Sequence, residues 1–401
     1  MVNNNNNKVL NVPHLRFPEF SGEWDSFKLV ELGKFIGGGT PSSSNLSFWT
    51  GSIPWISSSD IKEDNINNIS ISRYITEDAI EKSATKYCPA PVILIVSRVG
   101  VGKVALSHTS LCTSQDFCNI IDIKCHPVFL SYNLLRTMKR KSREVQGTSI
   151  KGITSDELQK IRVFIPKNKD EQNKISNLLT LLDERIATQN KIIEKYESLI
   201  KGIVDELMTV LLKGELYPFS SFYIKAGEGG TPTTSVDEYY SGGTIPFIKI
   251  EDLSCKYLTS NKDFITELGM QKSSAWLIPA HSVIYSNGAT IGAISINEYP
   301  ICTKQGILGI VPNTNINVEY LYLLMSSSYF SKEVNRIVTE GTMKTAYLKD
   351  INHIKCPLPS MAQQQNITNL TSSIEKKLFV EQELLKLLNI QKQHLLHTMF
   401  I

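Results

Sequence analysis

The sequence predicts an α+β protein in which two similar α/β domains are separated by two long antiparallel coiled-coil helices, a pseudo-twofold internal repeat. Three observations lead to this fold class. A series of short motifs returns in the same order about 190 residues later. Each copy mixes short β-rich runs with turns, and each copy ends in a long apolar stripe with helical spacing.

The repeat is visible in motifs that keep both their residues and their order. A Gly-Gly-Thr-Pro motif begins at Gly38 and again at Gly229, and Cys112 returns 190 residues later as Cys302. Solenoid repeats span only ~20–50 residues, so this period indicates the duplication of a whole domain. Further pairs are Ile53-Pro54-Trp55-Ile56 with Ile245-Pro246-Phe247-Ile248, Asp60 with Asp252, Ile75-Thr76-Glu77 with Ile265-Thr266-Glu267, and Gly147-Thr148 with Gly341-Thr342.

Within each copy, short elements alternate with Gly, Ser, Asn and Pro clusters that are typical of turns. Buried strands are predicted at 92–96, 120–123 and 282–285, and helices at 130–138 and 320–334. The chain then divides into a partly disordered N-terminal segment, a first domain, a first long helix, a second domain and a second long helix, at residues 1–23, 24–165, 166–213, 214–358 and 359–401.

Each domain is followed by a run in which apolar residues recur every three or four positions. Polar pairs interrupt both stripes at the same place, at Gln189-Asn190 and Glu381-Gln382. Helices of roughly 35–45 residues span about 50–65 Å, which is too long for one small core. Two ordinary core helices are an alternative, but we expect the two to pair through Ile175, Leu178, Leu182, Ile186, Ile193, Tyr196, Ile367, Leu370, Ile374, Leu378, Leu385 and Leu388.

The bulk composition is that of an ordinary intracellular protein. A net charge of +3 means that any nucleic-acid binding must come from local basic patches. Seven scattered cysteines without a CxxC pair indicate reduced thiols, and no signal peptide is recognisable, so we expect a cytoplasmic protein. No apolar run approaches the ~20 residues that cross a bilayer, so no membrane partner is expected.

Catalytic and metal motifs are tested and rejected. The run 35–39 superficially matches the glycine loop that binds S-adenosylmethionine, but a turn follows it where a helix is needed. The run 100–103 lacks the spacing and the hydroxyl residue of a phosphate-binding loop. Seven scattered histidines form no zinc pattern. The sequence therefore predicts no catalytic residue, no metal site and no bound cofactor.

Binding is the class that remains, and DNA is the partner that the polar residues favour. The run 136–143 carries five positive charges in eight residues, although a solvated helix face would look the same. Other candidates lie in loops where the two copies align but differ, as two readers of different bases would. One such alignment sets Ser97-Arg98-Val99-Gly100 against Ser286-Asn287-Gly288-Ala289. The candidates are Ser58, Ser59, Arg98, Lys103, Gln115, Lys139, Arg140, Arg143, Thr148, Lys151, Lys249, Asn287, Lys304, Gln305, Thr342 and Lys344.

This arrangement resembles the specificity subunits of type I restriction–modification systems over nearly the whole chain. The run 12–24 is similar to their N-terminal signature, as are the duplicated Gly-Gly-Thr-Pro and the Pro-x-x-x-x-Glu-Gln-x-x-Ile that starts at Pro166. The second copy departs from the pattern, because Glu215-Leu216-Tyr217 replaces the Glu-x-Trp start and the second helix ends sooner. The N-terminal segment could complete that second helix.

The resemblance implies a non-catalytic subunit that recognises double-stranded DNA. Each target-recognition domain would read one half of a bipartite target, and the paired helices would set the spacer. Two modification subunits would bring S-adenosylmethionine, and restriction subunits would bring ATP and Mg. The alternatives are a specificity subunit of a related bifunctional type IIB-like enzyme, a lone methyltransferase, or a coiled-coil adaptor without a DNA role.

Overall fold

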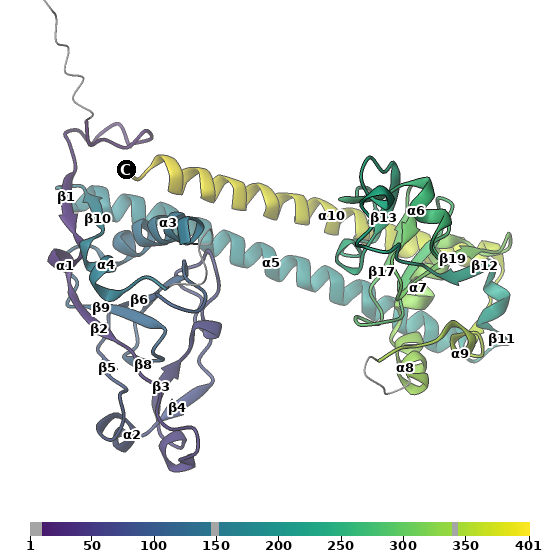
Figure 1. The fold of residues 1–401 in the computed structure, drawn as a ribbon, viewed down its shortest axis with the longest axis horizontal. Coiled ribbons are helices and arrows are strands. Elements are labelled where there is room, and N and C mark those ends of the chain that lie inside the picture. Colours follow the sequence, from purple (N-terminus) through teal and green to yellow (C-terminus); the bar gives the residue numbers. More distant parts are fainter. Residues whose placement is uncertain (1–9, 146–151, 339–343) are drawn as a thin grey trace, which may run out of the picture. The chain divides into compact units, whose positions relative to one another are not determined.

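The computed structural model describes residues 10–145, 152–338 and 344–401 (Figure 1). The chain folds into two compact units. Unit 1 comprises Met1–Asn190 with Glu383–Ile401, and unit 2 comprises Lys191–Gln382. Both units combine sheets with helices, so the predicted repeated α+β architecture is confirmed. The five sequence segments remain a prediction, because the compact units divide both long helices.

Unit 1 is built from two four-stranded sheets and a two-stranded ladder. The first sheet has the order β2 (Lys34–Gly37), β9 (Phe117–Ile121), β6 (Val92–Val96) and β7 (Val104–Ser107). The second has the order β4 (Arg73–Ile75), β3 (Ile53–Ile56), β8 (Leu111–Thr113) and β5 (Tyr87–Cys88), and the ladder joins β1 (Asp25–Lys28) to β10 (Arg162–Ile165). Its shorter helices are α1 (Leu29–Leu32), α2 (Glu77–Glu81), α3 (Pro127–Val145) and α4 (Ser155–Lys160).

Unit 2 repeats this plan with small changes. A five-stranded sheet has the order β12 (Tyr223–Glu228), β19 (Ile307–Pro312), β16 (Val283–Ser286), β17 (Ile294–Asn297) and β14 (Tyr257–Leu258). A three-stranded sheet has the order β15 (Asp263–Ile265), β13 (Ile245–Ile248) and β18 (Cys302–Thr303), and β11 (Leu216–Pro218) pairs with β20 (Lys355–Pro357). Its shorter helices are α6 (Glu267–Gln271), α7 (Val318–Ser326), α8 (Ser328–Ile337) and α9 (Leu348–Ile351).

Strand register shows that the two units are copies. In unit 1 the parallel pair β3 and β8 places Trp55 opposite Cys112. In unit 2 the parallel pair β13 and β18 places Phe247 opposite Cys302. A parallel pair set inside otherwise antiparallel sheets at the same register is a specific feature, so the order of the sequence motifs reflects one duplicated fold.

The predicted elements are found, with two differences. The strand predicted at 92–96 is β6, in which all five side chains are buried. The strand predicted at 120–123 is instead β9, which begins at Phe117 and ends at Ile121. The helix predicted at 320–334 is instead two helices, α7 and α8, which meet at Ser327. The backbone of Ser327 is extended, and its hydroxyl accepts a hydrogen bond from the amide of Phe330 at 3.2 Å. A serine in this role starts a new helix and breaks the preceding one.

The Gly-Gly-Thr-Pro motif is structural in both units. A Cβ atom at Gly38 would overlap the carbonyl oxygen of Ser114, and one at Gly229 would overlap the carbonyl oxygen of Thr303. The following glycines, Gly39 and Gly230, donate backbone hydrogen bonds to the same two neighbouring strands. Close backbone approach, and not a phosphate or a cofactor, therefore explains the repeated glycines.

Each domain leads into a long helix, α5 (Lys169–Leu211) or α10 (Met361–Thr398). Buried glutamines at equivalent positions attach the start of each helix to its own unit. Gln172 donates to the carbonyl of Pro166 at 2.9 Å and accepts from the amide of His126 at 3.0 Å. Gln364 donates to the carbonyl of Pro359 at 2.9 Å and accepts from the amide of Asn317 at 2.8 Å.

A buried charge cluster joins the end of α10 to α5 in unit 1. Lys392 forms an ion pair with Asp183, and both side chains are almost completely buried. The ammonium group of Lys392 also donates to the carbonyl of Asp64, and the Tyr132 hydroxyl donates to Asp183 at 2.8 Å. Because the N-terminal half of α5 meets the C-terminal half of α10, the two helix segments are antiparallel within this unit.

In unit 2 a lysine again anchors a long helix, but here the lysine lies outside the long helices and the carboxylate lies on α10. Lys256, which strand register places at the position of Ile66, pairs with Glu319 at the start of α7 at 2.5 Å and with Glu375 of α10 at 2.6 Å. Ile367 of α10 belongs to the same apolar core as Val204 and Met208 of α5. The halves of α5 and α10 that belong to this unit therefore also pack into one core.

Most predicted packing residues of the long helices are buried or half-buried. Five of them are buried, which are Ile175, Leu182, Ile186, Ile193 and Ile367. Six are half-buried, which are Leu178, Tyr196, Ile374, Leu378, Leu385 and Leu388. Leu370 differs from the prediction, because its side chain is 52% exposed. The buried face of α10 in unit 2 runs through Ile367, Thr368 and Thr371, and Leu370 lies beside this face, on the side away from Thr368.

The described part of the N-terminal segment, from residue 10, packs against both long helices of unit 1. Arg16 forms a two-pronged ion pair with Glu171 at 2.7 and 2.8 Å, and Trp24 donates to the same carboxylate at 3.2 Å. The amide of Leu15 donates to the carbonyl of Thr398 at 2.9 Å. The N-terminal segment therefore adjoins the end of α10, as the sequence suggested, while the Asn3–Asn7 run lies outside the described residues.

Candidate nucleic-acid interface

Four segments of unit 1 meet on one surface, which we call loop surface 1. The amino group of Lys103 donates to the carbonyl of Ser58 at 3.1 Å. The amide of Ser97 donates to the carbonyl of Asp116 at 2.8 Å, and the amide of Ile153 donates to the carbonyl of Ser97 at 2.7 Å. These bonds join the turn after β3, the β6–β7 hairpin, the β8–β9 turn and the segment before α4, which are residues 57–60, 97–103, 114–116 and 152–154.

The equivalent segments of unit 2 meet in the same way and form loop surface 2. The amide of Asn287 donates to the carbonyl of Gly306 at 3.0 Å, and the amide of Ala346 donates to the carbonyl of Asn287 at 2.9 Å. The amide of Lys304 donates to the carbonyl of Ile248 at 2.9 Å. The joined segments are residues 249–252, 287–293, 304–306 and 344–346, so one scaffold presents equivalent loops twice.

Strand register corrects the predicted alignment of the hairpin loops. The sequence comparison set Arg98 against Asn287, but β6 and β16 align Ser97 with Asn287. Asn287 is 1% exposed and donates its amide to the carbonyl of Ala346 at 3.1 Å. Its side chain holds the segment before α9 in place and does not reach the surface, so Asn287 is not available to contact DNA. The residue equivalent to Arg98 is Gly288.

Several predicted DNA-contacting lysines are engaged within the protein. Lys103 binds the carbonyl of Ser58, and Lys139 pairs with Asp64 at 2.8 Å. Lys249 pairs with Asp263 at 2.8 Å, and this contact raises the pKa of Lys249. These three ammonium groups stabilise loops and helix packing in the free protein, so their roles are first of all structural.

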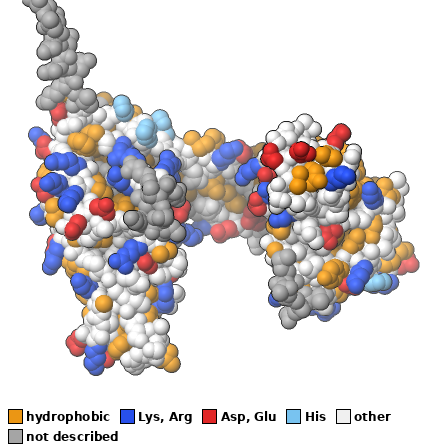
Figure 2. Space-filling view, viewed as in Figure 1, with side chains coloured by type: hydrophobic (Ala, Val, Ile, Leu, Met, Phe, Trp, Pro, Cys, Tyr) orange, Lys and Arg blue, Asp and Glu red, His pale blue; other side chains and the backbone are white. Residues whose placement is uncertain are grey.

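Other predicted residues are exposed and ready to contact a partner. Arg98, Arg140, Arg143, Lys304 and Gln305 are exposed. Lys and Arg side chains gather over the α3 region in the space-filling view (Figure 2). An added Cβ at Gly102 would lie 3.1 Å from the Cβ of Ser142, so the β6–β7 hairpin contacts the basic end of α3. Loop surface 1 is therefore continuous with a cationic helix end.

The remaining candidates are placed as follows. Gln115 is exposed and accepts a hydrogen bond from Thr40 of the Gly-Gly-Thr-Pro motif. Ser59 is exposed beside the half-buried Ser58, and Lys344 is exposed on loop surface 2. Thr148, Lys151 and Thr342 lie outside the described residues.

Sequence reasoning missed one pair of oppositely charged side chains in each unit. The pair supports the turn after β3 in unit 1 and the turn after β13 in unit 2. In unit 1, Arg73 binds Asp60 and lies 4.6 Å from the centre of the Trp55 ring. The equivalent residue of β15 is Asp263, which binds Lys249. The 190-residue offset aligns Arg73 with Asp263. The sequence alone therefore shows that a positive side chain of unit 1 is replaced by a negative one in unit 2. The two loop surfaces thus differ in the placement of their charges on a similar scaffold.

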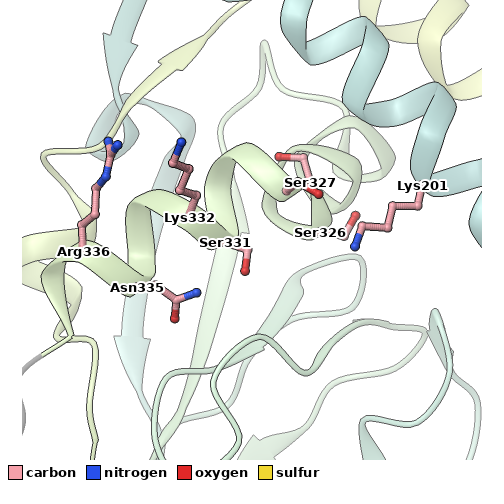
Figure 3. Close-up of a pocket in the computed structure, with 8 residues that line it drawn as sticks. Lys201, Ser326, Ser327, Ser331, Lys332, Asn335 and Arg336 are labelled. Atoms are coloured by element: carbon pink, nitrogen blue, oxygen red, sulfur yellow. The ribbon is translucent and has the colours of Figure 1, made fainter.

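A pocket in the described part of unit 2 does not resemble a catalytic site. It has a volume of about 560 Å³ and is lined by α8 and by Lys201 of α5. In Figure 3, Lys332 and Arg336 point to the opposite side of α8 from Ser331 and Asn335. Asp205 already accepts hydrogen bonds from the amide and hydroxyl of Ser328 at the start of α8. No nucleophile paired with a base lines this pocket.

The described ranges 10–145, 152–338 and 344–401 contain neither a metal-binding cluster nor a membrane-spanning helix. None of their His, Cys, Asp and Glu side chains form a group of three or more that could hold a metal ion. None of their helices combines the length and the apolar character that crossing a membrane requires.

Comparison with known proteins gives a consistent family. The family model described as "Type I restriction modification DNA specificity domain" matches twice, at residues 21–198 and 222–389. The type I restriction enzyme MjaIX specificity subunit of Methanocaldococcus jannaschii is 26% identical over 390 residues, which cover 90% of this chain and 89% of the relative. The EcoR124I/EcoR124II specificity subunit of Escherichia coli is 34% identical over 177 residues, which cover 42% of this chain and 43% of the relative.

Two solved structures share the fold. The type I restriction–modification S subunit from M. genitalium superposes with a TM-score of 0.54 at 18% identity, over 97% of this chain and 99% of that one. A chain from a study of complex assembly and conformational transition of the type I R-M system superposes with a TM-score of 0.56 at 14% identity, over 93% of this chain and 96% of that one. At these identities the likeness concerns the fold.

Proposed function

Because this chain belongs to the family of type I restriction–modification DNA specificity proteins, we propose that it is the non-catalytic subunit that recognises double-stranded DNA in such a complex. Each unit reads one half of a bipartite target. The observation that carries this proposal is the pair of equivalent loop surfaces. One scaffold with different polar side chains at matching loops is what two readers of different base sequences require.

The two surfaces differ in side chains that can reach base edges. Loop surface 1 offers Arg98 and Gln115, and loop surface 2 offers Lys304 and Gln305. Arg, Lys and Gln are residues that read base edges in the major groove, while cations of α3 suit backbone phosphates. We therefore expect an asymmetric target with unlike halves.

The long helices act as the spacer in this proposal. At 1.5 Å per residue, the 43 residues of α5 span roughly 65 Å. Within each unit, segments of α5 and α10 pack on the recognition domain through buried contacts. Lengthening both helices by equal insertions should therefore change the spacer of the target and leave both half-sites unchanged.

In this proposal the partner subunits carry out the catalytic steps. Two modification subunits dock on the helices and bring S-adenosylmethionine, and restriction subunits bring ATP and Mg in the full complex. The location is the cytoplasm, where the DNA and S-adenosylmethionine are found. No cofactor is assigned to this chain.

Methylome sequencing of cells that carry this chain with its modification subunits tests the proposal. We expect one bipartite motif with methylated adenine. Gln115→Ala should relax or change the first half alone, and Lys304→Ala the second half alone. Leu46→Ala is the control and should leave the motif intact, because Leu46 is 77% exposed in unit 1 and lies outside loop surface 1 and the long helices. Methyl transfer by the purified chain alone, or no bipartite motif, would contradict the proposal.

A further inference from the structure

The tip of the β6–β7 hairpin in unit 1 exposes an arginine next to an apolar residue. Val99 is 67% exposed, whereas Val101, two residues on, packs against the main core of unit 1. Gly100 and Gly102 have φ angles of +85° and +114°, which allow the tight turn that separates the two valines. The hairpin therefore directs one valine inward and presents the other on loop surface 1.

This tip is held on several sides. Lys103 donates to the carbonyl of Ser58, and Gly102 lies against Ser142 of α3. A Cβ at Gly152 would lie 3.1 Å from the Cα of Arg98, so the segment before α4 supports the base of the tip. A base-reading group needs a fixed position, because hydrogen bonds to base edges are sensitive to direction.

Arg98 differs from the neighbouring cations in having no hydrogen bond or ion pair in the described part of the chain. Lys103, Lys139 and Arg73 are all engaged, with Ser58, Asp64 and Asp60. The guanidinium group of Arg98 is exposed and carries five donors that match two acceptors on one base edge. Among these four cations, Arg98 is the one that can bind DNA without first breaking an internal contact.

We propose that Arg98 and Val99 form a base-reading pair in the major groove, with Arg98 on O6 and N7 of a guanine and Val99 against the C5-methyl group of a nearby thymine. This inference rests on the proposed DNA-recognition function and names the bases that loop surface 1 reads. Arginine paired with guanine and an apolar side chain against the thymine methyl are both geometrically suited contacts.

Unit 2 supplies an internal comparison. Strand register places Gly288 and Ala289 at the positions of Arg98 and Val99. Gly288 has no side chain to reach a guanine, and Ala289 reaches less far than a valine. This hairpin therefore cannot read the same bases, and the half-site of unit 2 lacks the guanine–thymine requirement set by Arg98 and Val99.

The test uses the complete chain bound to its modification subunits, and duplexes that carry the motif found by methylome sequencing. Each thymine of the target is replaced in turn by deoxyuridine, which lacks only the C5-methyl group. One methyl group is worth about 0.8 kcal/mol, so binding should weaken about 4-fold at one thymine of one half-site. In Val99→Ala the same replacement should have little effect, because the contact is already lost.

Arg98→Ala should lower discrimination at one guanine by about 5-fold or more, since a good bidentate pair is worth about 1–3 kcal/mol. Leu46→Ala is the matched control, because Leu46 is 77% exposed in unit 1 outside loop surface 1. It should bind all duplexes like the parent chain.

The outcomes separate the inference from the function on which it rests. If the complex binds selectively but no thymine couples to Val99, the base-reading pair is refuted and the DNA-recognition function stands. If Arg98→Ala weakens binding to every sequence equally, Arg98 contacts phosphate, and the assignment to guanine is wrong. If the complex shows no sequence-selective binding at all, the proposed function itself is refuted.

Discussion

Replacing Lys392 by methionine removes the positive charge that α10 places against Asp183, while a long side chain remains to fill the space. Both residues of this ion pair are 3–4% exposed. The carboxylate of Asp183 would keep the Tyr132 hydroxyl as a hydrogen-bond donor but would lose its counter-charge. The carbonyl of Asp64 would lose its donor as well.

Breaking one side of a buried ion pair costs about 3–5 kcal/mol, because the other charge stays desolvated. For a folding unit of about 200 residues, 1 kcal/mol shifts the unfolding temperature by about 2–4 °C. Lys392→Met should therefore lower the unfolding temperature of unit 1 by about 6–20 °C. Removing the polar groups of all three side chains, in Lys392→Met with Asp183→Leu and Tyr132→Phe, should recover most of this loss, although the carbonyl of Asp64 still lacks its donor.

Differential scanning calorimetry and denaturant unfolding of the complete chain measure the effect. Lys386→Met, on the same helix segment, is the control and should change stability by less than about 1 kcal/mol, because its pair with Glu383 is exposed. A Lys392→Met chain as stable as the parent would show that Lys392 does not compensate the buried carboxylate. A triple variant as unstable as the single one would assign the loss to packing.

Three further predictions follow from local environments. Gly38→Ala should destabilise unit 1 by about 3 kcal/mol or more in denaturant unfolding, whereas Gly37→Ala, with open space around its Cβ, should be tolerated; equal effects would contradict the close-approach argument. Burial lowers the pKa of His126, so the unfolded chain takes up its proton more readily. Stability should be full above about pH 6.5 and decline as the pH falls toward the lower folded pKa, and His126→Gln should remove that slope in pH-dependent melting. Burial raises the pKa of Cys112 to about 12, whereas Cys255 is exposed, so mass spectrometry after alkylation at pH 8 should find Cys255 modified first; equally fast labelling of Cys112 would refute this.

The loop candidates show how far sequence reasoning reached. Comparing the two copies identified the loops that meet on each surface, because duplicated folds keep loop positions while loop residues change. It misplaced Asn287 by one residue, because a shift of one residue in a hairpin leaves no clear trace in a sequence. Strand pairing fixed the register and showed that Asn287 is buried.

The sequence by itself determined the duplication, the strands and the two long helices. Their signals are local, since motif order and apolar periodicity depend on residues close together in the chain. Tertiary structure decided which cations are engaged and which remain available. Lys392 and Asp183 are 209 residues apart, and Lys103 and Ser58 are 45 residues apart, so no local pattern relates them. Arg98 stands out only once its neighbours have been matched with partners that folding brings to them from distant parts of the chain.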